Sequence, residues 1–227
     1  SGRMGMATEW YRCESWTTAE EQQFFAKLGR ARKDGRAQYL RVQAVHLVES
    51  RDLRLLEVAE SLLNMILTDY PDNRLEKSPA LTMLGGIYRT RGHNERALDY
   101  FKQAIDFEKE FPNVICGASL SFAEIVVEES RSELYDEVAE ILVAEIEKGG
   151  FLFPSQRYTS SSVLSVIYAS KGDQEKAKFH ADIAESNAVA TTNTLWNSRK
   201  RSLGLVEERK VWLDKKVREG LRVATKL

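Results

Sequence analysis

Cysteine, proline and long apolar runs are all scarce in this sequence. The 227 residues include two cysteines and four prolines, and Cys13 and Cys116 form neither a disulfide framework nor a C-x-x-C motif. No apolar run approaches the ~18–20 residues of a membrane-spanning helix, and no stretch resembles a secretory leader, so we expect a protein of the reducing cytoplasm. A composition of 43% hydrophobic and 30% charged residues excludes a disordered chain and favours a helix-rich one.

The sequence also lacks the common catalytic and nucleotide-binding motifs. It contains no P-loop, G-x-G-x-x-G, G-x-S-x-G or H-E-x-x-H. The three histidines, His46, His93 and His180, have no second ligand four residues away, as metal sites on helices often do. We therefore expect neither a metal nor a cofactor.

One group of residues keeps an enzymatic alternative open. Glu124 and Glu128 share a helical face, and paired carboxylates can carry out acid–base catalysis. Cys116 precedes them near an expected helix start, where a thiol can be activated, although no histidine is near it in sequence. We favour a solvated or partner-facing acidic stripe and a buried cysteine.

Charge is unevenly distributed along a chain whose net charge is only −1. Residues 1–41 carry 8 basic and 5 acidic groups, and residues 195–227 carry 10 and 4, so residues 42–194 hold the remaining 15 and 25. A basic end of this kind can contact nucleic acid or an anionic membrane surface. Because the acidic body complements it within the same chain, we expect no nucleic-acid partner; membrane-surface contact stays an alternative.

Four segments share one helical pattern: an alanine, an apolar or small residue four positions later, and another three positions after that. They are Ala59-Leu63-Ile66, Ala97-Phe101-Ala104, Ala139-Val143-Ile146 and Ala177-Ala181-Ala184. Offsets of four and three place each trio on one face of a helix. The leading alanines are 38, 42 and 38 residues apart (97−59, 139−97, 177−139), which is typical of stacked helical hairpins.

Two similar turn sequences precede the second and fourth of these alanines. They are RGHNER and KGDQEK. Gly92 and Gly172 can adopt the left-handed conformation that closes a helix. Asn94 and Asp173 can then cap the next one. These turns predict equivalent helix pairs.

The surrounding residues resemble the tetratricopeptide repeat over 78–112, and again over 158–190. The matching residues in the first are Leu81, Leu84, Gly85, Tyr88, Ala97, Phe101 and Ala104, with Pro112 after them. Segments 38–71 and 115–148 match in their second helices. The resemblance implies an all-α fold: a right-handed superhelical array of antiparallel helix hairpins with capping helices, about eleven helices in all and no sheet.

The resemblance divides the chain into four parts. We expect an expression scar at 1–5, an N-terminal aromatic segment and capping helix at 6–36, about four hairpins at 37–190, and basic capping helices at 191–227. The last two helices are expected at 195–203 and 205–223.

The N-terminal helix is expected to begin at a capping box at Thr17 and to run to about Lys33, with a break at Gly35. Its apolar stripe, expected to pack on the next helix, is Phe24, Phe25 and Leu28. The aromatic residues expected to seal the first hairpin are Trp10, Tyr11 and Trp16.

In the tetratricopeptide family, the first helices of successive hairpins line a concave groove, so the resemblance implies a protein or peptide partner. The groove residues are Thr82, Met83, Gly86 and Arg89 from the second hairpin, Ser121, Glu124 and Glu128 from the third, and Ser162, Val163 and Val166 from the fourth. Met83 and Val163 offer apolar contact, and Arg89 offers a bidentate donor. The glutamates suit a positively charged ligand.

Three functions are compatible with this reading. The favoured one is a non-catalytic bacterial scaffold that binds a protein or peptide. The alternatives are a specific inhibitor or immunity-type protein that neutralises one toxin or enzyme through its acidic body, and an enzyme with a site near Glu124, Glu128 and Cys116. A homodimer is compatible with all three.

Overall fold

The computed structural model describes residues 9–112, 117–193 and 202–222. Within these residues the backbone forms α-helices and one short 3-10 helix, and no strand. The all-α prediction is therefore confirmed. The chain divides into two compact units, residues 1–118 (unit 1) and 119–227 (unit 2).

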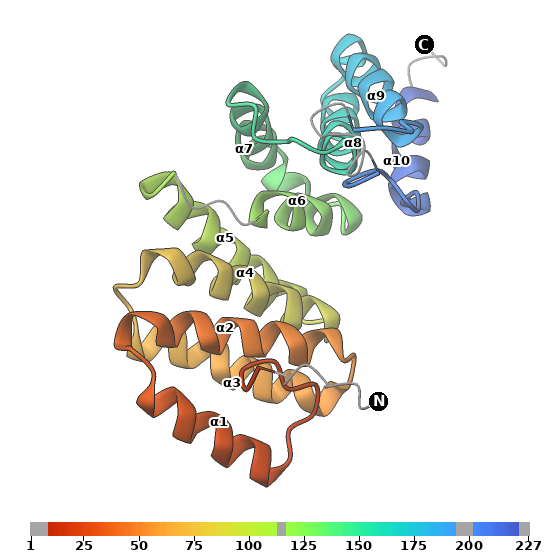
Figure 1. Cartoon of the computed structure of the whole chain (residues 1–227). Helices are drawn as coiled ribbons and strands as arrows, with labels where there is room; N and C mark the ends of the chain where they lie inside the picture. Colours follow the sequence, from red (N-terminus) through yellow and green to blue (C-terminus); the bar gives the residue numbers. More distant parts are fainter. Residues whose placement is uncertain (1–8, 113–116, 194–201, 223–227) are drawn as a thin grey trace, which may run out of the picture. The chain divides into compact units, whose positions relative to one another are not determined.

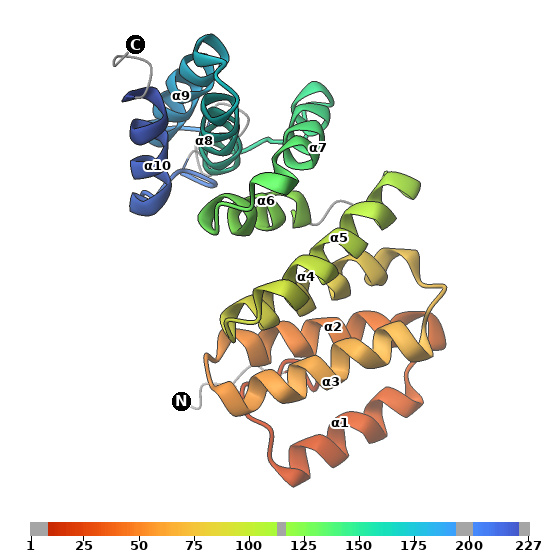
Figure 2. The same ribbon diagram turned by 180° about the vertical axis from the view of Figure 1, so that it is seen from behind.

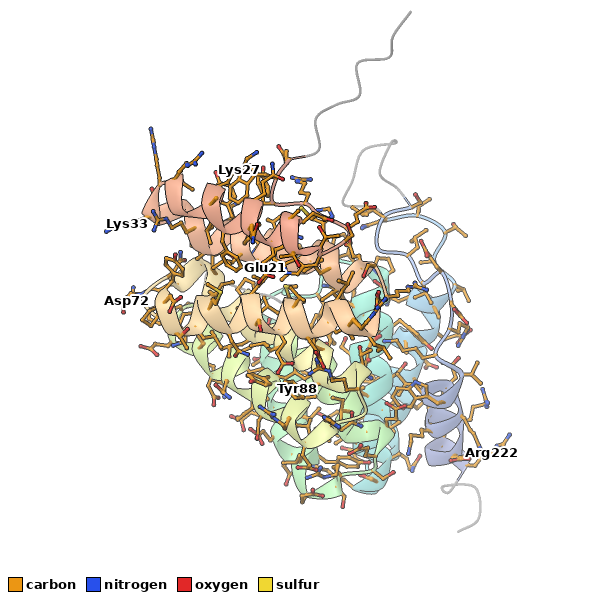
Figure 3. All side chains as sticks on the ribbon, turned by 90° about the horizontal axis from the view of Figure 1, so that it is seen from below. Glu21, Lys27, Lys33, Asp72, Tyr88 and Arg222 are labelled. Atoms are coloured by element: carbon orange, nitrogen blue, oxygen red, sulfur yellow. The ribbon has the colours of Figure 1, made fainter. Side chains whose placement is uncertain are left out.

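Unit 1 is built from consecutive helices that pack in pairs (Figure 1). Its helices are α1 (Thr18–Arg30), α2 (Lys33–Glu49), α3 (Leu53–Asp69), α4 (Arg74–Thr90) and α5 (Asn94–Glu110). α2 pairs with α3, and α4 pairs with α5. The second pair stacks on the first because α4 packs mainly on α3 and less on α2. Charged side chains such as Lys27 and Lys33 lie on the outside (Figure 3).

Unit 2 is organised around α8, which contacts α7, α9 and α10 (Figure 2). From the unit boundary onward, the elements are α6 (Ala118–Glu128), a 3-10 helix (Ser132–Leu134), α7 (Tyr135–Glu147), α8 (Pro154–Ser170), α9 (Gln174–Ala188) and α10 (Val211–Arg222). α8 and α9 form another close pair. The described part of the chain thus contains ten α-helices and one 3-10 helix, where we expected about eleven helices.

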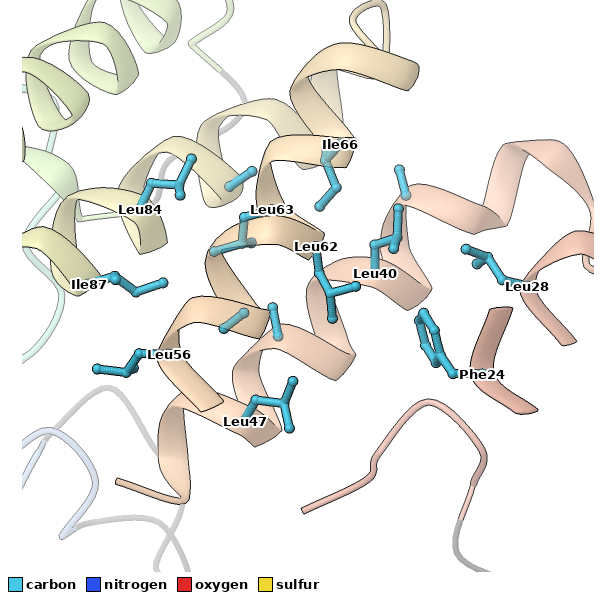
Figure 4. Packing of buried hydrophobic residues seen from close by; sticks show 14 residues of the cluster. Phe24, Leu28, Leu40, Leu47, Leu56, Leu62, Leu63, Ile66, Leu84 and Ile87 are labelled. Carbon is cyan, nitrogen blue, oxygen red and sulfur yellow. The ribbon is translucent and has the colours of Figure 1, made fainter. Parts of the chain in front are cut away.

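The core of unit 1 is a continuous cluster of apolar side chains, all aliphatic except Phe24, shown in Figure 4. It is formed by Leu40, Ala44 and Leu47 of α2, Leu56, Ala59, Leu62, Leu63 and Ile66 of α3, and Ala80, Leu84 and Ile87 of α4, with Ala37 and the α1 residues Phe24 and Leu28. The expected packing of α1 is thus confirmed. The aromatic residues of the N-terminal segment, Trp10, Tyr11 and Trp16, also pack against this cluster.

The first helix of each hairpin is followed by a residue with left-handed backbone conformation. These residues are Arg51 (φ 58°), Gly92 (φ 78°), Ser130 (φ 54°) and Gly172 (φ 80°). After α4, the amide of Gly92 donates to the carbonyl of Arg89 at 2.9 Å, and the next amide donates to Tyr88 at 2.9 Å. The turn at Gly172 has the same pair of bonds, so both are Schellman caps. The predicted equivalence of the two glycine turns is confirmed.

A small buried residue stands seven positions before each left-handed residue. The four are Ala44, Gly85, Ala123 and Ser165. A Cβ added at Gly85 would lie 2.5 Å from the ring of Phe101, so glycine permits the close approach of α4 and α5. Ser165 fits at the same position in α8 because its hydroxyl donates to the carbonyl of Ala177 at 2.7 Å. The spacing from the left-handed residue therefore marks equivalent positions in α2, α4, α6 and α8.

The predicted alanine repeat is only partly equivalent in space. All four leading alanines are buried. However, Ala97 and Ala177 lie five residues after their turns, whereas Ala59 and Ala139 lie eight and nine residues after theirs. The turns themselves are 41, 38 and 42 residues apart (92−51, 130−92, 172−130). In the third trio, Ala139 is buried and Val143 is half-buried, but Ile146 is 40% exposed.

The N-terminal boundary also differs from the prediction. Thr17 caps α1, as expected, by accepting from the amide of Glu20 at 3.2 Å. Gly35 does not break a helix; it lies in the first turn of α2. The break falls at residues 31–32, where Arg36 donates to the carbonyls of Ala31 (3.1 Å) and Gly29 (2.8 Å) and so satisfies the end of α1.

Two further boundaries need correction. α5 begins at Asn94 itself, with His93 at the cap position, whereas Asp173 caps α9 as predicted by accepting from the amide of Lys176 at 3.0 Å. The last helix begins at Val211 instead of residue 205. The helix predicted at 195–203 lies almost wholly outside the described residues.

Candidate functional site

The closing turns place the predicted partner-binding residues on one face of the first helices. Met83, Ser121 and Val163 each lie nine residues before a left-handed residue, and Gly86, Glu124 and Val166 lie six before it. We call this set, with Thr82, Arg89, Ser162 and Ala169, which lie ten or three residues before the turns on α4 and α8, the first-helix face. Its members are Thr82, Met83, Gly86 and Arg89 on α4, Ser121 and Glu124 on α6, and Ser162, Val163, Val166 and Ala169 on α8. Glu128 lies one position further along and is exposed.

On α4, the first-helix face is half-buried and mixed in character. Met83 packs at the edge of the unit 1 core. The Thr82 hydroxyl donates to the carbonyl of Ser78 at 2.9 Å, within its own helix. Gly86 leaves open space where a Cβ would stand. This part of the face can offer apolar contact and room for a side chain.

On α8, the first-helix face is covered by α10 of the same chain. Ser162 and Val163 are 1% and 0% exposed, so they are not accessible to a partner in this conformation. A Cβ at Gly220 of α10 would lie 2.8 Å from the Cβ of Ala169, and the side-chain amide of Gln174 donates to the Gly220 carbonyl at 3.3 Å. The sequence predicted a capping helix at the C-terminal end, but not that it would cover this face of α8.

A polar cluster, buried at Tyr158 but partly exposed at Arg209 and Glu185, joins the start of α10 to α8 and α9. Arg209 donates to both oxygens of Glu185, at 3.0 and 2.6 Å, and to Oδ2 of Asp214 at 2.9 Å. The hydroxyl of Tyr158 donates to Oδ1 of Asp214 at 2.7 Å and accepts from the amide of Lys210 at 3.0 Å. Because Arg209 donates to both oxygens of Glu185, the contact constrains the relative orientation of the two side chains in addition to matching their charges.

The pKa values in this cluster are shifted in the directions that its contacts require. Burial, and then the hydrogen bond to Asp214, raise the pKa of Tyr158 to about 12, so it stays a neutral donor. The hydrogen bonds from Arg209 lower the pKa of Glu185 and keep that carboxylate ionised at neutral pH.

Glu124, the predicted acidic residue of α6, is paired with the basic C-terminal segment. The ammonium group of Lys210 forms an ion pair with Glu124 and donates to the hydroxyl of Thr159 at 3.1 Å. Lys216 donates to the hydroxyl of Ser130 at 2.9 Å. Within unit 2, basic residues of the C-terminal end therefore contact residues of the acidic body, as predicted. A pocket of about 440 Å³ opens beside these groups and is lined in part by Glu124, Tyr158, Thr159 and Lys210.

The other predicted chemistry gains no support from the described residues. Cys116 lies outside them, so the suggested grouping with Glu124 and Glu128 stays a prediction. Within 9–112, 117–193 and 202–222, no three His, Cys, Asp or Glu side chains are grouped to hold a metal ion. No helix in these same ranges combines the length and apolarity needed to cross a bilayer.

Several residues of this site were missed by sequence reasoning. Arg209, Asp214 and Tyr158 stand in no motif, and their pairing depends on the fold. Gly220 carried a usable signal, because a glycine on the apolar side of an amphipathic helix marks close packing.

Comparisons with protein-family models, with curated proteins and with solved structures find no match for this chain. The tetratricopeptide resemblance therefore depends on the quoted residues and on the equivalent hairpins.

Proposed function

We propose that this protein is a non-catalytic, tetratricopeptide-like scaffold of the bacterial cytoplasm, which binds a protein or peptide along its first-helix face. One observation carries the proposal: on α8, a helix of the same chain already lies beside residues that the resemblance assigns to a partner, with Val217 near Ser162 and Gly220 near Val166. Close approach of Gly220 to Ala169, and ion pairs to Glu185 of α9 and Glu124 of α6, hold that helix and the residues before it. A surface that binds a helix in this way has the chemistry of helix-in-groove recognition.

The charge distribution indicates the kind of partner. Residues 42–194 hold 25 acidic and 15 basic groups, and the two carboxylates that meet the C-terminal segment, Glu124 and Glu185, each take a basic side chain. A basic partner segment would find the same carboxylates and would associate faster at low salt.

Affinity capture from the source cell tests the proposal. The wild-type chain is compared with a variant that carries Arg89→Glu and Glu124→Arg, and with the control Lys27→Glu, which changes an exposed charge on α1. We expect the control to retain the wild-type partners and the double variant to lose them. Circular dichroism verifies that all three remain helical, and identical partner lists would contradict the proposal.

The acidic excess of residues 42–194 also supports the second candidate, a specific inhibitor or immunity-type protein. This candidate predicts one high-affinity partner whose binding weakens steeply with added salt. Capture of a broad set of partners that survives high salt would contradict it.

A further inference from the structure

α10 does not take the position that stacking of another hairpin would give it. In unit 1, α4 follows the α2–α3 pair and packs mainly on α3, the second helix. In unit 2, α10 follows the α8–α9 pair but packs mainly on α8, the first helix. α10 is thus shifted from the stacking position onto the first-helix face, where a ligand of the array would lie.

The two helices run parallel along this face. Thr159, near the start of α8, meets Lys210, and Ala169, near the end of α8, meets Gly220. Between these ends, Ser162 lies beside Val217, around a pocket of about 140 Å³. The α8 part of the face therefore contacts an apolar stripe of α10 that ends in a glycine and that follows two basic residues.

The attachment of α10 is weaker than that of the array helices. Leu213 is the one buried residue among Val211–Arg222, whereas α9 buries two and α3 and α5 each bury five. The ion pair between Arg209 and Glu185 is partly exposed, with 40% and 59% of the two side chains accessible, so solvent weakens it relative to a buried pair. A helix of 12 residues is also marginal without its packing.

We propose that the α8 part of the first-helix face is an exchange site for a basic amphipathic helix of a partner protein, with α10 as its competing occupant. The inference rests on the proposed function and names its class of partner. The partner helix carries a basic pair immediately before its first residue, as at Arg209 and Lys210, and a small residue in its last turn, as at Gly220. Binding exposes α10, and α10 in turn weakens the binding of helices that fit poorly.

Competition of this kind gives a quantitative expectation. When the binding-competent, open form is a small fraction of the molecules, the apparent Kd rises by the inverse of that fraction. A change that loosens α10 in the full chain, but leaves α8 intact, must therefore tighten the binding of an external helix.

The experiment measures, by fluorescence anisotropy, the affinity of the full chain for a labelled peptide of residues 205–222. The full chain is used as wild type and as Gly220→Val, which forces α10 away from Ala169. The control is Gly29→Val, since Gly29 is also helical but has open space around it. We expect Gly220→Val to bind the wild-type peptide about 10-fold more tightly than the wild-type chain does, and the control to match wild type.

A charge exchange tests which contacts are used. Glu185→Arg in the Gly220→Val chain should weaken binding of the wild-type peptide. A peptide with Arg209→Glu should restore binding to that chain. Restored binding supports docking of the peptide in the orientation of α10, with its basic pair at Glu185 of α9, because adventitious peptide adhesion does not depend on this pairing.

Three results would overturn the inference: equal peptide affinity for Gly220→Val and wild type, no rescue in the charge exchange, or loss of helicity beyond α10 when Gly220 is changed. Sedimentation under the same conditions checks for a dimer, and dimerisation in place of peptide binding would also overturn it. Peptide exchange without any captured cellular partner would instead count against the proposed function alone.

Discussion

At the scale of single residues, backbone conformation relates positions whose residue types differ. Arg51 and Ser130 have the same left-handed φ as Gly92 and Gly172, although each carries a Cβ that this conformation disfavours. The helices α2, α4, α6 and α8 therefore are each followed by a left-handed residue, and the two that are not glycine bear strain there.

This strain predicts opposite effects of exchanging glycine at equivalent positions. Arg51→Gly should raise the free energy of unfolding by about 0.5–1 kcal/mol, because relief of the left-handed penalty exceeds the added chain entropy. Gly92→Ala should lower it by about 1 kcal/mol, and its Cβ would meet nothing within 4 Å, so the effect is one of backbone alone. Urea unfolding with an unchanged m value measures both. If both substitutions changed the free energy of unfolding in the same direction, the assignment of backbone strain to Arg51 would be contradicted.

Adjacent glycines in α4 provide a matched pair for close packing. Gly85→Ala should lower the free energy of unfolding by about 1–3 kcal/mol, because its Cβ would lie 2.5 Å from the ring of Phe101. Gly86→Ala should raise it by about 0.5–1 kcal/mol, because its Cβ meets open space and alanine favours the helix. Equal values from thermal or urea unfolding would show that α4 and α5 are not in close contact.

At the scale of elements, α10 is positioned by polar groups from three different parts of unit 2. Glu185 comes from α9, Tyr158 from α8 and Glu124 from α6, and each meets residues between 209 and 214. The docking of α10 should therefore respond to pH and salt more than the apolar core does.

The pH response has a definite sign. Hydrogen bonds from Arg209 lower the pKa of Glu185 below its ordinary value, although burial and the nearby Asp214 carboxylate act in the opposite direction. The stabilisation that this carboxylate provides is thus complete above about pH 5 and is lost as pH falls through the lower, folded-state pKa. Fluorine NMR of 5-fluorotryptophan at Trp212 should show α10 loosening over this acidic range, whereas Glu185→Gln should show it already at pH 7. An identical titration in the two proteins would contradict this role.

At the scale of the whole molecule, units 1 and 2 each contain their own buried residues. The fourteen-residue apolar cluster of unit 1 is formed by α1–α4 alone. In repeat arrays, stability is a sum of local and nearest-neighbour contributions, so a local change should act mainly within its own unit.

Hydrogen exchange tests this independence. Gly85→Ala should reduce amide protection in α2–α5 by about 10-fold, which corresponds to about 1.4 kcal/mol, and should leave α8 and α9 within experimental error. Mass spectrometry of peptic fragments resolves the two regions. A uniform loss of protection across both units would show that they unfold as one.

Much of the architecture follows from residues close together in sequence. The turns at Gly92 and Gly172, the small residue Gly85 and the stripe of Phe24 and Leu28 each depend on neighbours within about two helical turns, and the periodicity predicted them. The turns at residues 51 and 130 were missed because their left-handed residues are not glycine.

The sequence alone determined the all-α class, the helix pairs and the residues that lie on the first-helix face. Only the tertiary structure decided that α10 covers this face on α8. The contacts responsible join residues far apart in the chain: Tyr158 and Asp214 are 56 positions apart, and Glu124 and Lys210 are 86 apart. Local periodicity fixes which side of a helix is apolar, but the partner of that side is chosen by packing and charge across the folded unit.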